Sequence, residues 1–201
     1  VPIGGGKDSV VTVELLAAAR MHPVQFAVNP NQVIFRVGRV KGHPVIPATR
    51  EIDERLLELN SEGALNGHVP VTAINSLISL VQARIIGLGP VVMSLEASAS
   101  EATLVWDGVE VNHQWSKSEE AEGLLHDMLG PQAGLSAGAY FSLLRPYSEL
   151  KIARYFSGLR EYHPVITSCN RAFRRGVDDA RWCANCDKCR FIFLILSPFL
   201  P

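Results

Sequence analysis

A glycine-rich turn between an extended segment and a helix constrains the fold of this chain more than any other feature. Residues 1–3 suit the end of a strand, and Gly4–Gly6 form the turn that follows. Ser9–Arg20 carries apolar side chains at the spacing of one helix face, and Val24–Val28 is a short strand candidate. Strand, turn, helix and strand in this order build a parallel sheet with helices on its faces, so the sequence predicts an α/β fold.

The rest of the chain continues this alternation. The predicted strands are Val33–Val37, Val91–Leu95 and Val165–Ser168. The predicted helices are Glu51–Asn60, Thr72–Ile86, Ser116–Leu129, Ser148–Phe156 and an apolar C-terminal helix. Thr72 is expected to cap the most apolar helix and Gly87 to end it, while Trp106–Gly108 forms a turn. No linker divides these elements, so we expect residues 1–201 to form one body.

The composition excludes several classes of protein. The 201 residues are 47% hydrophobic and 19% charged, which suffices for a folded core and argues against disorder. The formal net charge of −1 gives no electrostatic case for a nucleic-acid or acidic-membrane partner. The apolar run Phe191–Leu196 has six residues, far fewer than the ~20 that span a bilayer. No signal peptide is visible, so we expect a cytoplasmic fragment of a longer chain, of undetermined oligomeric state.

The turn and the residues after it have the chemistry of a phosphate-binding loop. The loop residues are Gly4, Gly5, Gly6, Lys7, Asp8 and Ser9. Glycines let backbone N–H groups approach an anion, and the following helix adds the positive end of its dipole. Ser9 can donate its hydroxyl to a phosphate, and Asp8 can hold Mg²⁺ beside it. A Walker A loop is excluded because Lys7 is followed by Asp8, and the third glycine of a dinucleotide-binding fingerprint is missing.

This loop resembles the pyrophosphate-binding loop (PP loop) of the N-type ATP pyrophosphatases, Ser-Gly-Gly-x-Asp-Ser. The chain keeps five of the six positions and has Gly4 where that family has serine. The resemblance implies that the loop holds the polyphosphate of ATP. The structural alternative is a glycine-rich turn that only joins two elements.

The four cysteines, Cys169, Cys183, Cys186 and Cys189, all lie in the last 33 residues. Three have the spacing Cys-x2-Cys-x2-Cys, and Cys169 lies 14 residues upstream, after a predicted strand. Four thiolates in this arrangement can surround a structural Zn²⁺ tetrahedrally. An iron–sulfur cluster or metal-free buried thiols are open alternatives, although the x3-Cys-Pro of the ferredoxin run is missing. Basic residues expected to offset the thiolate charge are Arg174, Arg175, Arg181, Lys188 and Arg190.

Two families resemble larger parts of the sequence. The PP loop together with the cysteines resembles the 7-cyano-7-deazaguanine synthases. The intervening segments instead resemble the UDP-N-acetylmuramoyl-L-alanyl-L-glutamate epimerases of peptidoglycan synthesis, the MurL family. Those segments are Asn66–Ser76, Leu95–Glu101, Val111–Ser118 and Arg145–Ala153. The resemblance extends through nearly the whole chain. It implies a PP-loop ATP-binding domain of the adenine-nucleotide alpha-hydrolase-like (HUP, Rossmann-like) type, with a zinc loop at 169–189.

The MurL resemblance implies an isomerase that uses ATP and Mg²⁺ to invert the terminal L-glutamate of UDP-MurNAc-L-Ala-L-Glu. Its partner is thus a small-molecule substrate. Adenylation would convert the glutamate carboxylate to an acyl-adenylate. The α-proton would then be easier to remove, because its loss would not place a second negative charge beside a carboxylate. A base removes that proton, another proton returns on the opposite face, and hydrolysis releases the D-glutamate product.

Several side chains are candidates for roles in this reaction. Ser98 and Ser100 follow a predicted strand, where ligands of open α/β sheets bind, and are candidates for nucleotide contact. His113 and Lys117 lie in a polar segment and are candidate catalytic residues, His113 being suited to acid–base work. Ser98 and Ser100 could instead belong to an ordinary polar loop, and His113 could be a surface or hydrogen-bonding histidine.

Other polar residues are less specific in their chemistry. Arg145 and Lys151 could pair with substrate carboxylates or phosphates, although a lysine on a helix is usually solvated. His68 precedes an apolar helix and is expected to be a capping or core residue. Two alternative functions stay open: a PP-loop ligase such as a 7-cyano-7-deazaguanine synthase, and a non-catalytic, zinc-stabilised nucleotide-binding module.

Overall fold

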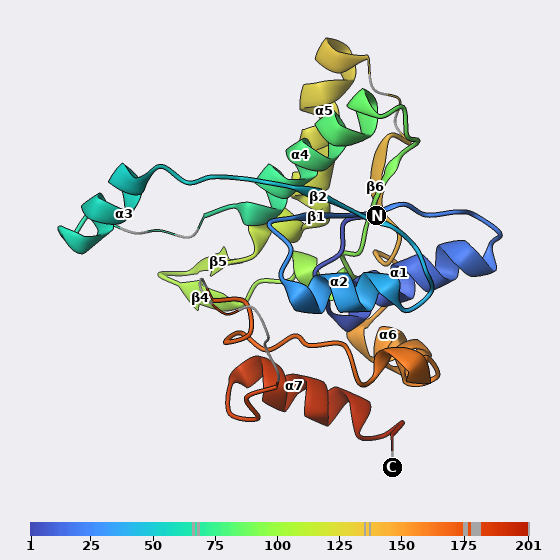
Figure 1. Ribbon diagram of the computed structural model, residues 1–201. Helices are drawn as coiled ribbons and strands as arrows, with labels where there is room; N and C mark the ends of the chain where they lie inside the picture. Colours follow the sequence, from blue (N-terminus) through green and yellow to red (C-terminus); the bar gives the residue numbers. More distant parts are fainter. Residues whose placement is uncertain are drawn as a thin grey trace.

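The computed structural model has a mixed α/β fold with parallel strands (Figure 1). It describes residues 1–65, 67, 69–134, 136, 138–174, 177 and 182–200. The helices are α1 Lys7–Ala18, α2 Gln32–Arg39, α3 Glu54–Ser61, α4 Val71–Ile85, α5 Glu119–Ala133, α6 Glu149–Ser157 and α7 Asp187–Leu196. The strands are β1 Gln25–Val28, β2 Val45–Ala48, β3 Val91–Met93, β4 Leu104–Trp106, β5 Val109–Val111 and β6 Tyr140–Ser142.

The N-terminal residues pair in parallel with β1, as the glycine turn predicts, and β1 also pairs with β2, a strand that was not predicted. β1 pairs in parallel with β2, with Gln25 opposite Val45. Pro2 forms a parallel bridge to Phe26, and the Ile3 N–H donates to the Phe26 carbonyl at 2.8 Å. Residues 1–3 therefore extend along β1, and α1 is the crossover between them. The helix begins at Lys7, two residues earlier than predicted.

A second parallel pair and a hairpin complete the strands. β3 pairs with β6, with Val91 opposite Tyr140, and the buried faces of both strands contribute to the interior. β4 and β5 form an antiparallel hairpin whose turn residues Asp107 and Gly108 have φ values of +48° and +76°. Two successive positive φ values are typical of a type I′ hairpin turn, so the predicted turn at this position is confirmed.

Three local predictions were wrong. Val33–Val37 is not a strand but belongs to α2, because Asn31 accepts a hydrogen bond from the Ile34 N–H at 3.2 Å and caps a helix there. Val33, Ile34 and Val37 are all buried, which is the spacing of one helix face. The segment 165–168 is not a strand either. Val165 lies in a turn, in which the N–H groups of Val165 and Ile166 donate to Tyr162 O at 3.0 and 3.1 Å, and Thr167 N donates to Gly5 O at 3.1 Å.

The third error concerns the start of α4. Pro70, not Thr72, occupies its N-cap position, and Thr72 lies inside the first turn. Proline has no side-chain acceptor, so the N-terminus of α4 has no side-chain capping hydrogen bond. The predicted end at Gly87 is confirmed: its φ is +68°, and Leu88 N donates to Ala83 O at 2.9 Å.

The main hydrophobic core lies where α1, α2, α6 and α7 meet. Val11, Val33, Leu144 and Phe156 are at most 1% exposed there. Burial of such a side chain contributes roughly 1.5–3 kcal/mol. Cys169 and Cys189 belong to the same core, so the cysteine loop is packed against the rest of the chain.

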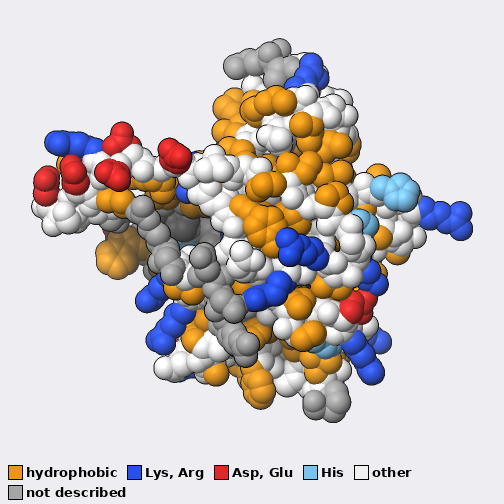
Figure 2. Space-filling view, viewed as in Figure 1, with side chains coloured by type: hydrophobic (Ala, Val, Ile, Leu, Met, Phe, Trp, Pro, Cys, Tyr) orange, Lys and Arg blue, Asp and Glu red, His pale blue; other side chains and the backbone are white. Residues whose placement is uncertain are grey.

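The α3 and α4 regions differ from this core. α3 projects from the body and has no buried residue, and Figure 2 shows acidic side chains on it. On α4 the apolar side chains of Val81 and Ile85 are exposed. Among the described residues, no helix is both long and apolar enough to cross a bilayer.

Candidate functional site

The glycine loop is shaped by close contact with the segment 165–169. Gly5 has a φ of +78°, which favours glycine, and a Cβ there would meet a Val33 methyl at 3.3 Å. A Cβ on Gly6 would lie 2.7 Å from the Ser168 hydroxyl oxygen. Gly6 is the N-cap of α1 and gives no side-chain cap to the helix, so backbone N–H groups at this end are available to an anion. Ser9 is buried and its hydroxyl donates to the Gly6 carbonyl at 3.2 Å.

Lys7 is the most deeply buried charged residue of the loop. Its side chain is 2% exposed, and Nζ donates to carboxylate oxygens of Asp8 and Glu149. Burial alone would lower the pKa of Lys7, but the charges of Asp8 and Glu149 outweigh this effect and raise the pKa. Burial, followed by the nearby charge of Asp8, also raises the pKa of Glu149. The loop thus contains an ammonium group held between two carboxylates.

A polar cavity of about 460 Å³ opens beside this ion cluster. It brings together three of the predicted site residues, Asp8, Ser98 and Lys117, with four charged residues that were not predicted to line it. The additional charged residues are Glu96, Glu101, Glu149 and Lys188. The cavity lies beyond the carboxyl ends of β3 and of the extended segment 1–3, which is where open α/β sheets bind ligands.

Lys117 is half-buried at the wall of this polar cavity. Its Nζ donates to Gln114 Oε1 at 2.5 Å. Burial, and then the positive charge of Lys188, lower the pKa of Lys117. A larger fraction of its amine is therefore neutral near physiological pH than for an exposed lysine, which is the state a proton acceptor needs.

Of the predicted residues in the glycine loop, only Asp8 lines the polar cavity; Gly4, Gly5, Gly6, Lys7 and Ser9 do not. Two predicted site residues outside the loop also lie outside the lining. His113 is exposed and its Nδ1 lies 3.0 Å from the Thr103 hydroxyl, with Nε2 3.2 Å from Gln114 Nε2. Thr103 and Gln114 do line the cavity, so His113 is at its rim. Ser100 accepts a hydrogen bond from the backbone N–H of Glu119 at 3.0 Å, at the start of α5.

Arg145 is an internal structural residue rather than a free anion-binding group. Its guanidinium donates to Glu122 at 2.9 Å and to the backbone carbonyls of Glu96 and Lys117, both at 3.0 Å. These bonds tie the loop after β3 to the segment that bears Lys117. Lys151 lies over the Tyr147 ring, with Nζ 4.3 Å from the centroid. His68, Arg175 and Arg181 lie outside the described residues.

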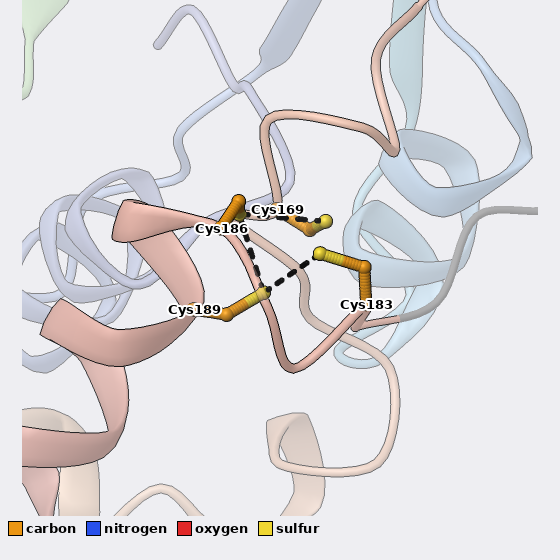
Figure 3. A group of neighbouring side chains, drawn as sticks. All are labelled: Cys169, Cys183, Cys186 and Cys189. Atoms are coloured by element: carbon orange, nitrogen blue, oxygen red, sulfur yellow. Dashed lines mark hydrogen bonds between the residues drawn. The ribbon is translucent and has the colours of Figure 1, made fainter.

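The four cysteines converge on one point (Figure 3). Their sulfur atoms lie within 4.8 Å of one another, and none forms a disulfide. Sγ–Sγ distances are 3.9 Å for Cys169–Cys186, 3.8 Å for Cys183–Cys189 and 3.5 Å for Cys186–Cys189. The group could hold a metal ion, because each thiol offers one ligand atom to the space between them.

Local backbone geometry directs these thiols inward. Cys186 is the N-cap of α7 and Cys189 lies in its first turn, while Ala184 has a φ of +55° that bends the loop back. A backbone hydrogen bond from Cys189 is the main cause that lowers the pKa of Cys186 to about 6. Cys186 is therefore ready to act as a thiolate ligand at neutral pH.

Sequence reasoning missed Glu149 because no local pattern connects it to Lys7. It follows the N-cap Ser148 and has the appearance of an ordinary first-turn acid of α6. Lys188 was assigned to charge compensation in the cysteine loop, but its side chain lines the polar cavity. Arg190 instead faces Asp187, with Nη1 3.7 Å from its carboxylate.

Comparison with known proteins assigns the chain to a family. The model of the MurL N-terminal domain matches residues 1–143, and that of the MurL C-terminal domain matches residues 165–201. A protein of Salinispora tropica, named UDP-N-acetyl-alpha-D-muramoyl-L-alanyl-L-glutamate epimerase, is 56% identical over 99% of this chain and 43% of its own length. Proteins of the same name from Micromonospora sp. and Xanthomonas oryzae pv. oryzae are 55% and 43% identical, over 44% and 45% of their lengths. The chain thus spans less than half of these relatives, and it belongs to the MurL family.

Proposed function

We propose that this chain carries the nucleotide site of an ATP-dependent epimerase acting on the terminal L-glutamate of UDP-MurNAc-L-Ala-L-Glu. The names of the relatives support the reaction and the substrate class. The observation that carries the nucleotide part is the polar cavity, in which Asp8 of the glycine loop meets Glu149 and Lys117. A cavity with both carboxylates and amines can hold a metal–phosphate complex and also transfer a proton.

The fold that best accounts for this site is a PP-loop domain of the adenine-nucleotide alpha-hydrolase-like type. Three observations support this assignment: the extended segment 1–3 pairs in parallel with β1, the glycine loop follows it directly, and α1 begins at the end of the loop. Residues 1–201 would then form one ATP-binding unit of a longer protein.

ATP would suit this loop because Gly5 and Gly6, packed closely against Val33 and Ser168, leave a turn without side chains at the start of α1. Backbone N–H groups of the loop and the start of α1 would hold the polyphosphate, with Ser9 beside them. Asp8 would hold Mg²⁺, which usually takes one or two carboxylates together with phosphate oxygens. Bound Mg²⁺ would offset phosphate charge when pyrophosphate leaves.

The reaction needs ATP because a free carboxylate suppresses the acidity of its α-proton. Attack of the glutamate carboxylate oxygen on the α-phosphorus releases pyrophosphate and leaves an acyl-adenylate. A base then removes the α-proton, and a proton is delivered to the other face of the same carbon. Water finally cleaves the acyl–phosphate bond, which gives AMP and the D-glutamate product. The oriented binding of both reactants contributes much of the rate.

Lys117 is our candidate for the proton acceptor, because it lines the cavity and its pKa is lowered. His113, at the rim, is the candidate for the second proton-transferring group. Ser98 lies in the cavity wall and is a candidate for nucleotide contact, whereas Ser100 would support the site through its bond to the start of α5.

We assign the metal of the four-cysteine centre as structural zinc. A regular tetrahedron with Zn–S bonds of ~2.3 Å has sulfur–sulfur edges of about 3.8 Å. Three of the six sulfur–sulfur distances, at 3.5–3.9 Å, are close to those edges, and all six lie within 4.8 Å. A multi-iron cluster would need some of the sulfurs farther apart, since they would ligate different irons. With four protein ligands, zinc would have no open position for catalysis.

The test is incubation of the full-length protein with ATP, Mg²⁺ and UDP-MurNAc-L-Ala-L-Glu, followed by acid hydrolysis and chiral analysis of glutamate. Formation of D-glutamate together with AMP supports the proposal. Formation of a new C–N bond instead would indicate a PP-loop ligase. Nucleotide binding without either product would indicate a non-catalytic module.

A further inference from the structure

Lys188 belongs to two sites at once. It lies between two members of the cysteine centre, Cys186 and Cys189, and is the second residue of α7. Its side chain nevertheless lines the polar cavity, together with Asp8 and Lys117. The first turn of α7 is anchored by the contact between Cys186 and Cys189 and by the contact of Cys186 with Cys169. The cysteine centre therefore fixes the backbone from which Lys188 reaches the cavity.

Two amines at the cavity form no ion pair among the described residues, although the carboxylates of Glu96 and Glu101 also line it and Glu96 acts on the charge of Lys117. Lys7 is neutralised by Asp8 and Glu149. Lys117 donates to the neutral Gln114, and the ammonium of Lys188 lies 5.5 Å from the Phe191 ring centroid. Among the described residues, neither Lys117 nor Lys188 has a carboxylate oxygen within 4.0 Å of Nζ. An anion bound between the two amines would relieve their mutual repulsion.

We propose that Lys188, held in the cysteine loop, binds a phosphate oxygen of the nucleotide in the polar cavity. The inference rests on the proposed function, because it assumes that the cavity receives ATP. A phosphate is the favoured anion because the glycine loop and the start of α1 border the same cavity through Asp8. The cysteine centre would then contribute to nucleotide affinity through this side chain as well as to folding.

The test measures binding of adenosine 5′-(α,β-methylene)triphosphate with Mg²⁺ to the full-length protein by calorimetry. We expect Lys188→Met to weaken this binding about tenfold, which is the loss of one hydrogen bond to a charged group. Adenosine, which has no phosphate, should bind the variant and the wild-type protein equally. Lys188→Arg should recover most of the affinity because it retains the charge.

Arg190→Met is the matched control, since it removes a positive charge from the same turn of α7 at a side chain that does not line the polar cavity. It should bind the analogue as the wild-type protein does, and all three variants should keep the wild-type metal content. If the wild-type protein binds the analogue and Lys188→Met binds it equally tightly, this inference is overturned while the proposed nucleotide site stands. Absence of analogue binding by the wild-type protein would overturn the proposed nucleotide site and this inference with it.

Discussion

The glycine loop and the cysteine centre are both short motifs, but they depend on the rest of the fold to very different degrees. Three of the four thiols come from seven consecutive residues, and only Cys169 is contributed from elsewhere. The glycine loop is completed by residues far along the chain, such as Glu149, which contacts Lys7 across 142 positions. A candidate metal site can therefore be inferred almost entirely from spacing, whereas the polar cavity needs tertiary structure to assemble its charges.

Substitution of a cysteine should have the largest effect, because it removes a cross-link of the main core. Cys169 is fully buried, and Cys169→Ser should lose the metal and destabilise the fold by at least about 4 kcal/mol. Metal analysis and thermal unfolding would measure this. Wild-type metal content and stability in Cys169→Ser would contradict a four-cysteine metal centre.

Lys117→Met should separate proton transfer from adenylation. General base catalysis contributes typically ~10²–10⁴-fold, so inversion should slow by about that factor while substrate-dependent ATP–pyrophosphate exchange continues. The pKa of Lys117 is lowered, and only its neutral amine accepts a proton. The wild-type rate of inversion should therefore rise with pH through this pKa, below the usual lysine range, and Lys117→Met should lose that rise. An unchanged pH profile in the variant would exclude Lys117 as the base.

Asp8→Ala should slow adenylation, the step that Lys117→Met leaves unchanged. Loss of the carboxylate that would hold Mg²⁺ should lower ATP–pyrophosphate exchange by about 10²–10³-fold. Asp127→Ala, at an exposed position on α5, is the control and should keep the wild-type rate. If both variants exchanged pyrophosphate as the wild-type protein does, the glycine loop would not be the adenylation site.

Gly5→Ala should have the smallest effect of the series. A side chain at a φ of +78° costs roughly 1–2 kcal/mol, and the added methyl group also meets Val33. We expect a lower melting temperature and weaker ATP binding. Gly42→Ala is the matched control, since Gly42 has a φ of +72° in open space away from the cavity. It should lower the melting temperature without changing ATP affinity. Equal effects of the two variants on ATP affinity would contradict a role of the glycine loop in binding ATP.

The features of this chain that could be predicted from sequence are those formed by residues close together in the chain. The strand–helix–strand order at the start of the chain, the hairpin turn at Asp107–Gly108 and the grouping of three cysteines within 183–189 were predictable, because each depends on residues close in sequence. Val33–Val37 was misassigned because a run of β-branched residues fits a strand, while the cap at Asn31 and burial against the core select a helix. The partners of Lys7 and the direction of Lys188 were not predictable, because contacts between distant elements determine them.

The most direct test of the central claim is solvent deuterium incorporation at the α-carbon of glutamate. The full-length protein would be incubated with UDP-MurNAc-L-Ala-L-Glu in D₂O, with and without Mg-ATP, and the glutamate analysed by mass and chirality. We predict that D-glutamate carrying one deuterium forms only with ATP, together with AMP and pyrophosphate. Deuterium incorporation without ATP, or D-glutamate that retains the original proton, would contradict activation of the carboxylate before proton exchange.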